Sequence, residues 1–168
     1  MEIYTVSFFG HREVEGAAEI ESRLERLLHD LITQKQYVEF LVGRDGEFDF
    51  LVASAIRRVV KQYGCGNTSL ILVLPYMKAE YRDNDQSYLS YYDEVGICVS
   101  SSEAHYKSAI QVRNRCMVDR SDLVVCCIQH NSGGAYKTVQ YAASPVTAPL
   151  SSEQPPLLHT LFATYFHL

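Results

Sequence analysis

The sequence predicts a three-layer α/β domain with a mostly parallel sheet of about five strands. Short runs of β-branched and aromatic residues alternate along the chain with longer segments in which apolar residues recur at helical spacing. This alternation is typical of strand–helix–strand units, whose crossovers are right-handed. The expected strands are also uniformly apolar, which indicates a sheet covered by helices on both faces.

Each expected element has its own signal in the sequence. The first strand is the run IYTVSFF at 3–9, which ends at Gly10. A helix is expected over 14–34, because leucines and isoleucines recur there at helical spacing between charged residues. The remaining strands are expected at 37–42, 70–74, 96–99 (the weakest) and 123–128. The remaining helices are expected at 50–63, at 104–117 and from about residue 135.

The composition changes after residue 143. Four of the five prolines lie at positions 145, 149, 155 and 156, which marks a linker or an irregular tail. We therefore divide the chain into a domain at 1–143 and a Pro-rich linker with an apolar tail at 144–168. As a helix, the tail would align Leu157, Leu161, Tyr165 and Leu168 on one face. We expect it to dock on the parent domain; the alternative is self-association as a homodimer or contact with another partner.

Charge and composition exclude several function classes. The net charge of -5 and the pI near 5.6 supply no overall positive field, so a nucleic-acid partner is not expected. The longest apolar run, 123–128, is far shorter than the ~20 residues of a membrane-spanning helix. The start MEIYTVSFFGHRE lacks the basic leader and apolar core of a secretion signal. The five cysteines have neither C-x-x-C nor zinc spacing, which predicts reduced structural thiols, no metal and a cytoplasmic location.

A ligand site is expected at one edge of the sheet, because open α/β sheets bind ligands at the carboxyl ends of their strands. Polar, Gly-rich and Arg-bearing segments follow the expected strands there. They are GHR at 10–12, GRDGEFD at 43–49, PY at 75–76 and QHNSGG at 129–134. This clustering is the main sequence argument for a site.

The last of these segments is a candidate phosphate loop. Ser132, Gly133 and Gly134 are small enough to let the backbone approach a ligand closely. The helix that follows offers unpaired N–H groups and the positive end of its dipole, which suit phosphate. An ordinary tight turn is the alternative interpretation. The loop is not of Walker type, because no Gly precedes Lys137-Thr138, and no G-x-G-x-x-G occurs in the chain.

Charged residues in the other segments are candidate ligand contacts. Arg12 and Arg44 are expected to pair with phosphate, since arginine binds phosphate in bidentate fashion; the alternative is a solvated surface role. His11 is a candidate ligand-binding or acid/base group, or a hydrogen-bonded structural histidine. Glu47 and Asp49 are candidate catalytic carboxylates or ribose ligands, although capping of the following helix explains at least one of them.

Five segments in order carry a resemblance to a known family: FFGHRE, GRDGEFD, LILVLPY, RNRCMVDRSDLVVCC and NSGGAYKTVQYA. Over residues 3–143 they resemble the YpsA-like branch of the SLOG superfamily, which includes relatives of the cytokinin-activating LOG enzymes and of DNA-processing protein A. The resemblance implies a Rossmann-like domain that binds a nucleotide or a nucleotide derivative, with the SGG loop on the phosphate. It places in or beside the pocket Gly10, Arg12, Gly43, Asp49, Asn114, Ser132, Gly133, Gly134 and Thr138.

The sequence departs from the family pattern in two places. LOG-type hydrolases carry P-G-G-x-G-T-x-x-E with a catalytic Glu, whereas residues 132–141 contain neither Glu nor Asp. Relatives also continue after this helix into a short strand, which the Pro-rich segment here shortens or removes, so that the tail is a candidate to replace it.

We therefore expect a non-catalytic module that binds or senses a nucleotide and requires no cofactor. One alternative is an enzyme that cleaves or transfers at N-glycosidic bonds, which needs Glu47 or Asp49 near the sugar. The other is a protein-interaction module with a vestigial pocket, which would use the apolar tail and the tyrosine-rich stretch 76–92.

Overall fold

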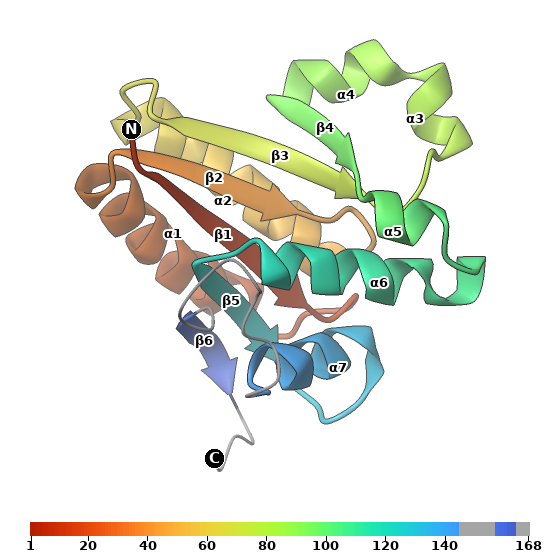
Figure 1. Cartoon of the computed structure of the whole chain (residues 1–168). Helices are drawn as coiled ribbons and strands as arrows, with labels where there is room; N and C mark the ends of the chain where they lie inside the picture. Colours follow the sequence, from red (N-terminus) through yellow and green to blue (C-terminus); the bar gives the residue numbers. More distant parts are fainter. Residues whose placement is uncertain (145–156, 164–168) are drawn as a thin grey trace.

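The computed structural model describes residues 1–144 and 157–163 of the chain. Within these ranges it is a three-layer α/β domain whose sheet is entirely parallel, in the order β4-β3-β2-β1-β5-β6 (Figure 1). The predicted fold class is thus confirmed. The strands are β1 (Ile3–Gly10), β2 (Tyr37–Val42), β3 (Thr68–Leu74), β4 (Glu94–Ile97), β5 (Leu123–Ile128) and β6 (Leu157–Ala163). The helices are α1 (Ala17–Gln34), α2 (Glu47–Tyr63), α3 (Ala79–Asp83), α4 (Asp85–Tyr91), α5 (Val99–Ser102), α6 (Tyr106–Asp119) and α7 (Gly133–Ala142).

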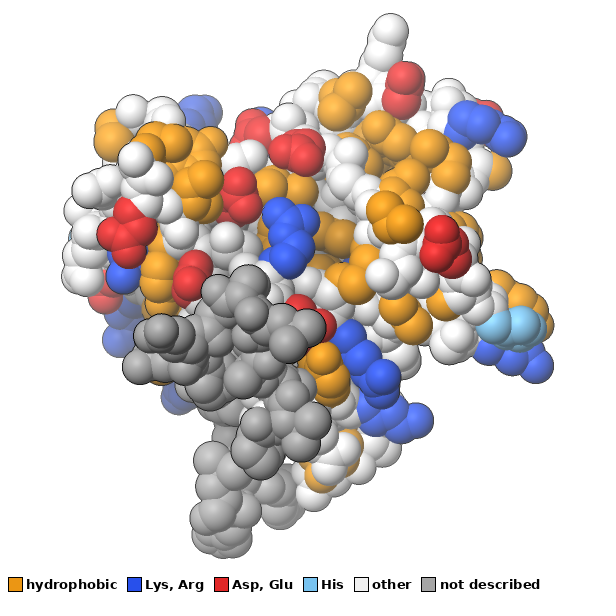
Figure 2. All heavy atoms as spheres, viewed as in Figure 1, with side chains coloured by type: hydrophobic (Ala, Val, Ile, Leu, Met, Phe, Trp, Pro, Cys, Tyr) orange, Lys and Arg blue, Asp and Glu red, His pale blue; other side chains and the backbone are white. Residues whose placement is uncertain are grey.

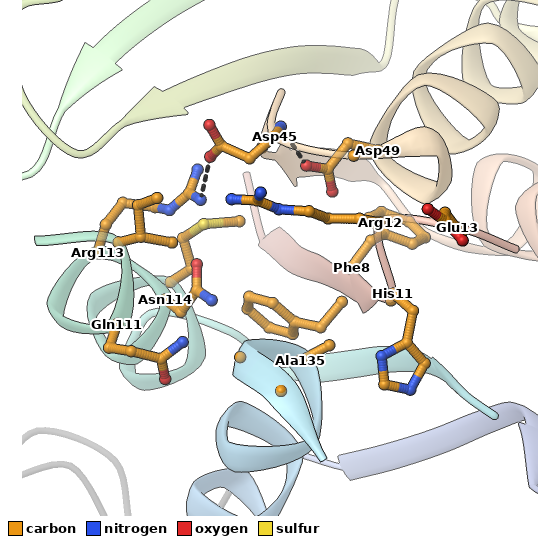
Figure 3. Close-up of a pocket in the computed structure, with 18 of the residues that line it drawn as sticks. Phe8, His11, Arg12, Glu13, Asp45, Asp49, Gln111, Arg113, Asn114 and Ala135 are labelled. Atoms are coloured by element: carbon orange, nitrogen blue, oxygen red, sulfur yellow. Dashed lines mark hydrogen bonds and ion pairs between the residues drawn. The ribbon is translucent and has the colours of Figure 1, made fainter. Parts of the chain in front are cut away.

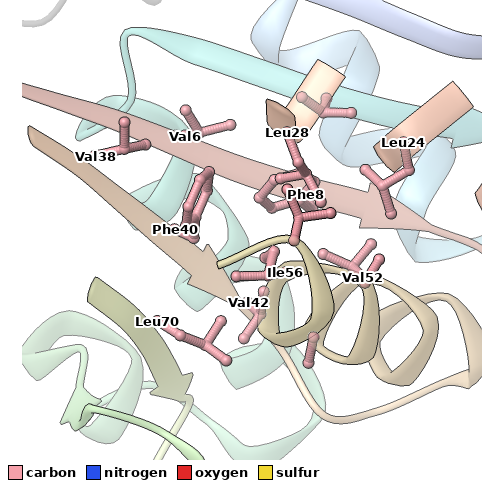
Figure 4. Close-up of a cluster of buried hydrophobic side chains, with 14 of the residues drawn as sticks. Val6, Phe8, Leu24, Leu28, Val38, Phe40, Val42, Val52, Ile56 and Leu70 are labelled. Atoms are coloured by element: carbon pink, nitrogen blue, oxygen red, sulfur yellow. The ribbon is translucent and has the colours of Figure 1, made fainter. Parts of the chain in front are cut away.

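Helices cover both faces of the sheet. On one face, α1 and α2 bury a large core against β1, β2 and β3, which includes Phe8, Leu24 and Ile56 (Figure 4). On the other face, α6 and α7 pack over a smaller cluster that includes Phe9 and Met117. Consecutive strand residues point to opposite faces, so Phe8 and Phe9 at the end of β1 serve the two layers separately.

The sixth strand comes from the apolar tail. β6 lies parallel to β5 in a register that pairs Leu123 with Leu157, and the Leu157 N–H donates to the Asp122 carbonyl at 2.8 Å. The helical alignment of Leu157 and Leu161 is therefore wrong, because this segment is extended and pairs its backbone with the edge of β5. Tyr165, Leu168 and the linker at 145–156 lie outside the described residues. The division of the chain at residue 143 stays a prediction.

The stretch between β3 and α6 contains three short helices that the sequence did not predict. α3, α4 and α5 have five, seven and four residues, too few to show a clear helical period. Tyr88 of α4 is buried, whereas Met77 and Leu89 are more than half exposed. Hydrophobic side chains gather on the surface in this region, in the upper right of Figure 2.

Candidate functional site

The pocket lies at the point in the sheet where the order of successive strands reverses. The chain passes from β1 outward to β2, β3 and β4, and then returns to place β5 on the other side of β1. Such a switch point opens a crevice at the carboxyl ends of the strands. Here it forms a cavity of about 540 Å³, lined by the end of β1, the loops after β1 and β2, α6, His130 and the start of α7 (Figure 3).

The N-terminus of α7 opens onto this cavity. Gly133 has a φ of +87°, a left-handed conformation that favours glycine, and turns the chain from the extended Ser132 into the helix. No side chain caps this end, and the first turn contains no acidic residue. Gly133, Gly134 and Ala135 line the cavity. The positive end of the helix dipole therefore faces the pocket.

Arg12 supplies a positive charge to the same cavity. Its guanidinium group makes no hydrogen bond or ion pair with any residue that the structure describes. In Figure 3 the side chain extends across the pocket toward Asp45 and Arg113. Two contacts hold its backbone: the Glu47 N–H donates to the Arg12 carbonyl at 2.8 Å, and the Cα packs against Gly46, where a Cβ would lie 2.7 Å away.

A buried ion pair forms the opposite wall of the pocket. Arg113 on α6 is 3% exposed; its Nη1 donates to the Val73 carbonyl at 2.7 Å and its Nη2 to Asp45 Oδ2 at 2.9 Å. Lys78 Nζ contacts the other Asp45 oxygen at 2.7 Å. Burial raises the pKa of Asp45, but these two cations outweigh it and hold the pKa below its ordinary value. The pair ties α6 to β3 and to the loop after β2.

Gly43 makes this arrangement possible. A Cβ at this position would lie 2.8 Å from Asp49 Oδ2 and 2.9 Å from Arg113 Nη1. Any larger residue would therefore push apart the carboxylate and the guanidinium group that meet over the end of β2. The glycine is required by this close approach rather than by its backbone angles.

The two candidate catalytic carboxylates both bind backbone N–H groups. Asp49 Oδ2 accepts from the Asp45 N–H at 2.8 Å, so that it satisfies a free donor at the start of α2. Burial raises the pKa of Asp49, more than its backbone hydrogen bonds and Arg113 lower it. Glu47 Oε2 accepts from the Val14 N–H at 2.9 Å and does not line the cavity. Asp49 does line it, and is half-buried.

Most of the site residues predicted from the sequence meet at this cavity, and four do not line it. Those that line it are Gly10, His11, Arg12, Gly43, Asp49, Asn114, Gly133 and Gly134. Thr138 lies behind the wall, where its hydroxyl accepts from Asn114 Nδ2 at 3.1 Å and donates to the Gly134 carbonyl at 2.9 Å. Ser132 precedes α7, Glu47 is bound to Val14, and Arg44 packs elsewhere.

Arg44 belongs to a different environment. Its guanidinium carbon lies 4.4 Å from the centre of the Tyr88 ring, and its Nη2 lies 3.6 Å from a Glu80 oxygen. The neighbouring Asp45, which was not among the predicted site residues, faces the pocket instead. Lys107, Gln111 and Arg113 were also missed. Lys107 and Gln111 share a face of α6 with Asn114, at positions i, i+4 and i+7, and this spacing is the signal that would have revealed Lys107 and Gln111.

Two histidines stack at the rim of the pocket. The rings of His11 and His130 are 3.6 Å apart and inclined by 15°, and the His130 N–H lies 3.4 Å from His11 Nε2. Burial of His11 and the adjacent His130 lower the pKa of His11, against a smaller opposing effect of this hydrogen bond. The neutral imidazole is the form whose Nε2 accepts from the backbone.

This lowered pKa predicts a loss of stability toward acidic pH. In the unfolded chain His11 binds a proton near its ordinary pKa of 6.5, whereas the folded chain does so only at lower pH. The contribution of neutral His11 to stability is therefore complete above the unfolded pKa of 6.5, and it is lost as the pH falls toward the lower pKa of the folded chain. His11→Gln should flatten the dependence of unfolding free energy on pH in this range, measured by denaturant titration. His29→Gln, on the exposed side of α1, is the control; equal slopes in both variants would contradict the assignment.

The fold and the cavity define the class: a doubly wound, all-parallel α/β domain of Rossmann-like type with a pocket at its switch point. No protein-family model matches this chain, and the curated proteins contain no match to it. None of the helices in the described ranges is long and apolar enough to cross a bilayer. Among the side chains that the structure describes, no three or more of His, Cys, Asp or Glu are arranged to hold a metal ion.

Proposed function

We propose that the pocket binds a nucleotide or a nucleotide derivative and catalyses no reaction on it. The observation that carries this proposal is that the open N-terminus of α7 and the unpaired Arg12 guanidinium group border the same cavity. A helix N-terminus and an arginine together provide backbone N–H donors, a positive dipole end and a bidentate cation, which is the combination that phosphate requires. The resemblance to the SLOG superfamily supports the same ligand class.

The use of the carboxylates favours binding over catalysis. Asp49 binds the Asp45 N–H at the start of α2, and Glu47 binds Val14 outside the cavity. A carboxylate that attacks or protonates a sugar must be free to reach it. The segment after β5 also lacks the Glu of LOG-type hydrolases. Asp49 and Glu13 at the cavity wall remain suited to accept hydrogen bonds from ribose hydroxyls.

We propose that the protein binds this ligand in the cytoplasm. All five cysteines are free thiols, which a reducing compartment maintains. The ligand is expected as a small molecule rather than a nucleic acid, because the chain carries a net charge of -5.

A thermal-shift panel on the full chain tests the proposal. The panel contains AMP, ADP, cyclic AMP and ADP-ribose, each against inorganic phosphate. A true ligand at about 100 times its Kd should stabilise the fold by ~2.7 kcal/mol. Arg12→Gln should abolish most of this ligand-induced shift. Arg44→Gln removes the same charge outside the cavity and should keep the shift, each variant being compared with its own ligand-free Tm.

Two outcomes would overturn the proposal. One is that no nucleotide raises the Tm, or that Arg12→Gln and Arg44→Gln respond alike. The other is chromatographic detection of free base released from AMP by the wild-type protein and abolished in Asp49→Asn, which would establish the N-glycosidic enzyme instead.

Gly133→Val gives a second check of phosphate binding. A branched side chain at this left-handed position should block the approach of phosphate to the backbone, so the ligand-induced rise in Tm should be lost.

A further inference from the structure

Two cysteines far apart in the sequence share a second cavity. Cys98 follows β4 and Cys116 lies on α6; both are half-buried and both line a cavity of about 350 Å³ that shares only Met117 with the first. α5 and α6 lie side by side in this part of the molecule (Figure 1). Each thiol shifts the pKa of the other, which indicates that the two side chains are neighbours on the wall of this cavity. The cavity therefore gives a small molecule access to a pair of adjacent sulfur atoms.

The two thiols differ in acidity. Burial raises the pKa of Cys98, but hydrogen bonds from the Cys116 thiol and from Ser101 and Ser100 outweigh it, so that the pKa lies below its ordinary value. Burial and the adjacent Cys98 raise the pKa of Cys116 to about 11. Nucleophilic attack requires the thiolate, so Cys98 is the more reactive of the two. Cys116, which lines the same cavity, then serves as the resolving thiol for oxidised Cys98.

We propose that Cys98 and Cys116 form a thiol modification site, which a two-electron oxidant such as hydrogen peroxide converts to a disulfide. The Cys98 sulfur attacks one peroxide oxygen; the S–O bond forms, the O–O bond breaks, and the departing hydroxide takes a proton to become water. The Cys116 sulfur then attacks the Cys98 sulfur; the S–S bond forms, the S–O bond breaks, and the second water leaves with the Cys116 proton. Two thiols lose two electrons, and one peroxide becomes two waters.

The other cysteines lack this combination. Cys126 and Cys127 are buried in β5, and burial raises the pKa of Cys127 to about 12. Cys65 is exposed beyond the end of α2 and does not line the cavity of the pair. It therefore serves as the internal reference for nonspecific oxidation. The proposal does not depend on nucleotide binding, because the two cysteines do not line the nucleotide pocket.

Peptide mapping of the peroxide-treated full chain provides the test. After blocking of free thiols and unfolding, trypsin cuts after Lys107, Arg113 and Arg115, so that peptides 83–107 and 116–120 stay together only through a Cys98–Cys116 disulfide. The linked pair should appear with the loss of two hydrogen atoms and disappear on reduction. Cys98→Ser and Cys116→Ser should each abolish it, whereas Cys65→Ser should retain it. In Cys116→Ser, dimedone should trap sulfenic acid on Cys98.

Labelling of the unsubstituted protein keeps the test independent of the variants' folding. In the native chain, limiting iodoacetamide should alkylate Cys98 faster than Cys116, because the pKa of Cys98 is lowered and that of Cys116 is raised. The proposal is overturned if excess peroxide leaves both thiols unlinked, or if the disulfide formed joins Cys65 or two chains. Equal alkylation rates of Cys98 and Cys116 would also overturn it.

Discussion

Gly10→Ala is expected to lower the free energy of unfolding by about 2–3 kcal/mol, although it adds only one methyl group. A Cβ at Gly10 would lie 2.3 Å from Phe48 Cγ, 2.4 Å from Cδ1 and 2.8 Å from Cβ. The Phe48 side chain is fully buried, so the ring has no solvent space into which it can move. Equilibrium unfolding in denaturant measures the loss.

Gly96→Ala is the matched control for this steric effect. Gly96 also lies in a strand, β4, but a Cβ there would meet no atom within 4 Å. This variant should change the free energy of unfolding by less than about 0.5 kcal/mol. Adding Phe48→Leu to Gly10→Ala should cost less than the sum of the two single changes, because the smaller side chain makes room for the methyl group. Equal losses in Gly10→Ala and Gly96→Ala would refute the steric explanation.

Arg113→Met is expected to lower the free energy of unfolding by about 3 kcal/mol, which is as much as Gly10→Ala or more. The substitution keeps most of the apolar volume but removes the cation between Asp45 and the Val73 carbonyl. The side chains of Arg113 and Asp45 are 4% and 20% exposed, so water replaces the lost partner poorly. Lys78 still contacts Asp45, which keeps the expected loss at the lower end of the range for a buried pair. Denaturant unfolding at neutral pH gives the measurement.

The same helix offers a control for Arg113. Arg115 is exposed, and its guanidinium carbon lies 5.2 Å from the centre of the Tyr141 ring, so Arg115→Met should cost less than about 1 kcal/mol. The double variant Arg113→Met with Asp45→Asn should lose less unfolding free energy than the sum of the two single variants. In the double variant, the carboxylate that Arg113→Met leaves without its arginine partner has been removed as well. Strict additivity would show that the ion pair contributes nothing.

The sequence predicts the first four elements well because each carries a complete pattern of its own. β1 and β2 are short apolar runs, and α1 and α2 each span more than four turns with a repeating apolar face. β6 shows how such patterns mislead. Its leucines also fit a helix, and the deciding factor is the open edge of β5, which lies more than thirty residues earlier in the chain and is brought into position only by the fold.

The residues of the candidate site also fall into those that the sequence predicts and those that it does not. Residues directly after strands, such as His11 and Arg12, could be predicted because the carboxyl ends of parallel strands meet at one edge. Arg113 could not, since its helix reaches the pocket only through the return of the chain from β4 to β5. Arg12 and Arg44 have the same local signal, yet only Arg12 lines the cavity. The aromatic ring of Tyr88 binds Arg44, and that contact comes from the short helices without a clear pattern.

The position of β6 has a consequence for synthesis of the chain on the ribosome. β5 is the apolar run LVVCCI, and among the described elements the strand that covers its outer edge is the last to be translated. Until residues 157–163 emerge, the nascent domain presents unpaired N–H and C=O groups along a hydrophobic strand, which is the arrangement that recruits other chains. A chain that ends before this segment therefore keeps the edge of β5 uncovered and is exposed to chaperones or to aggregation.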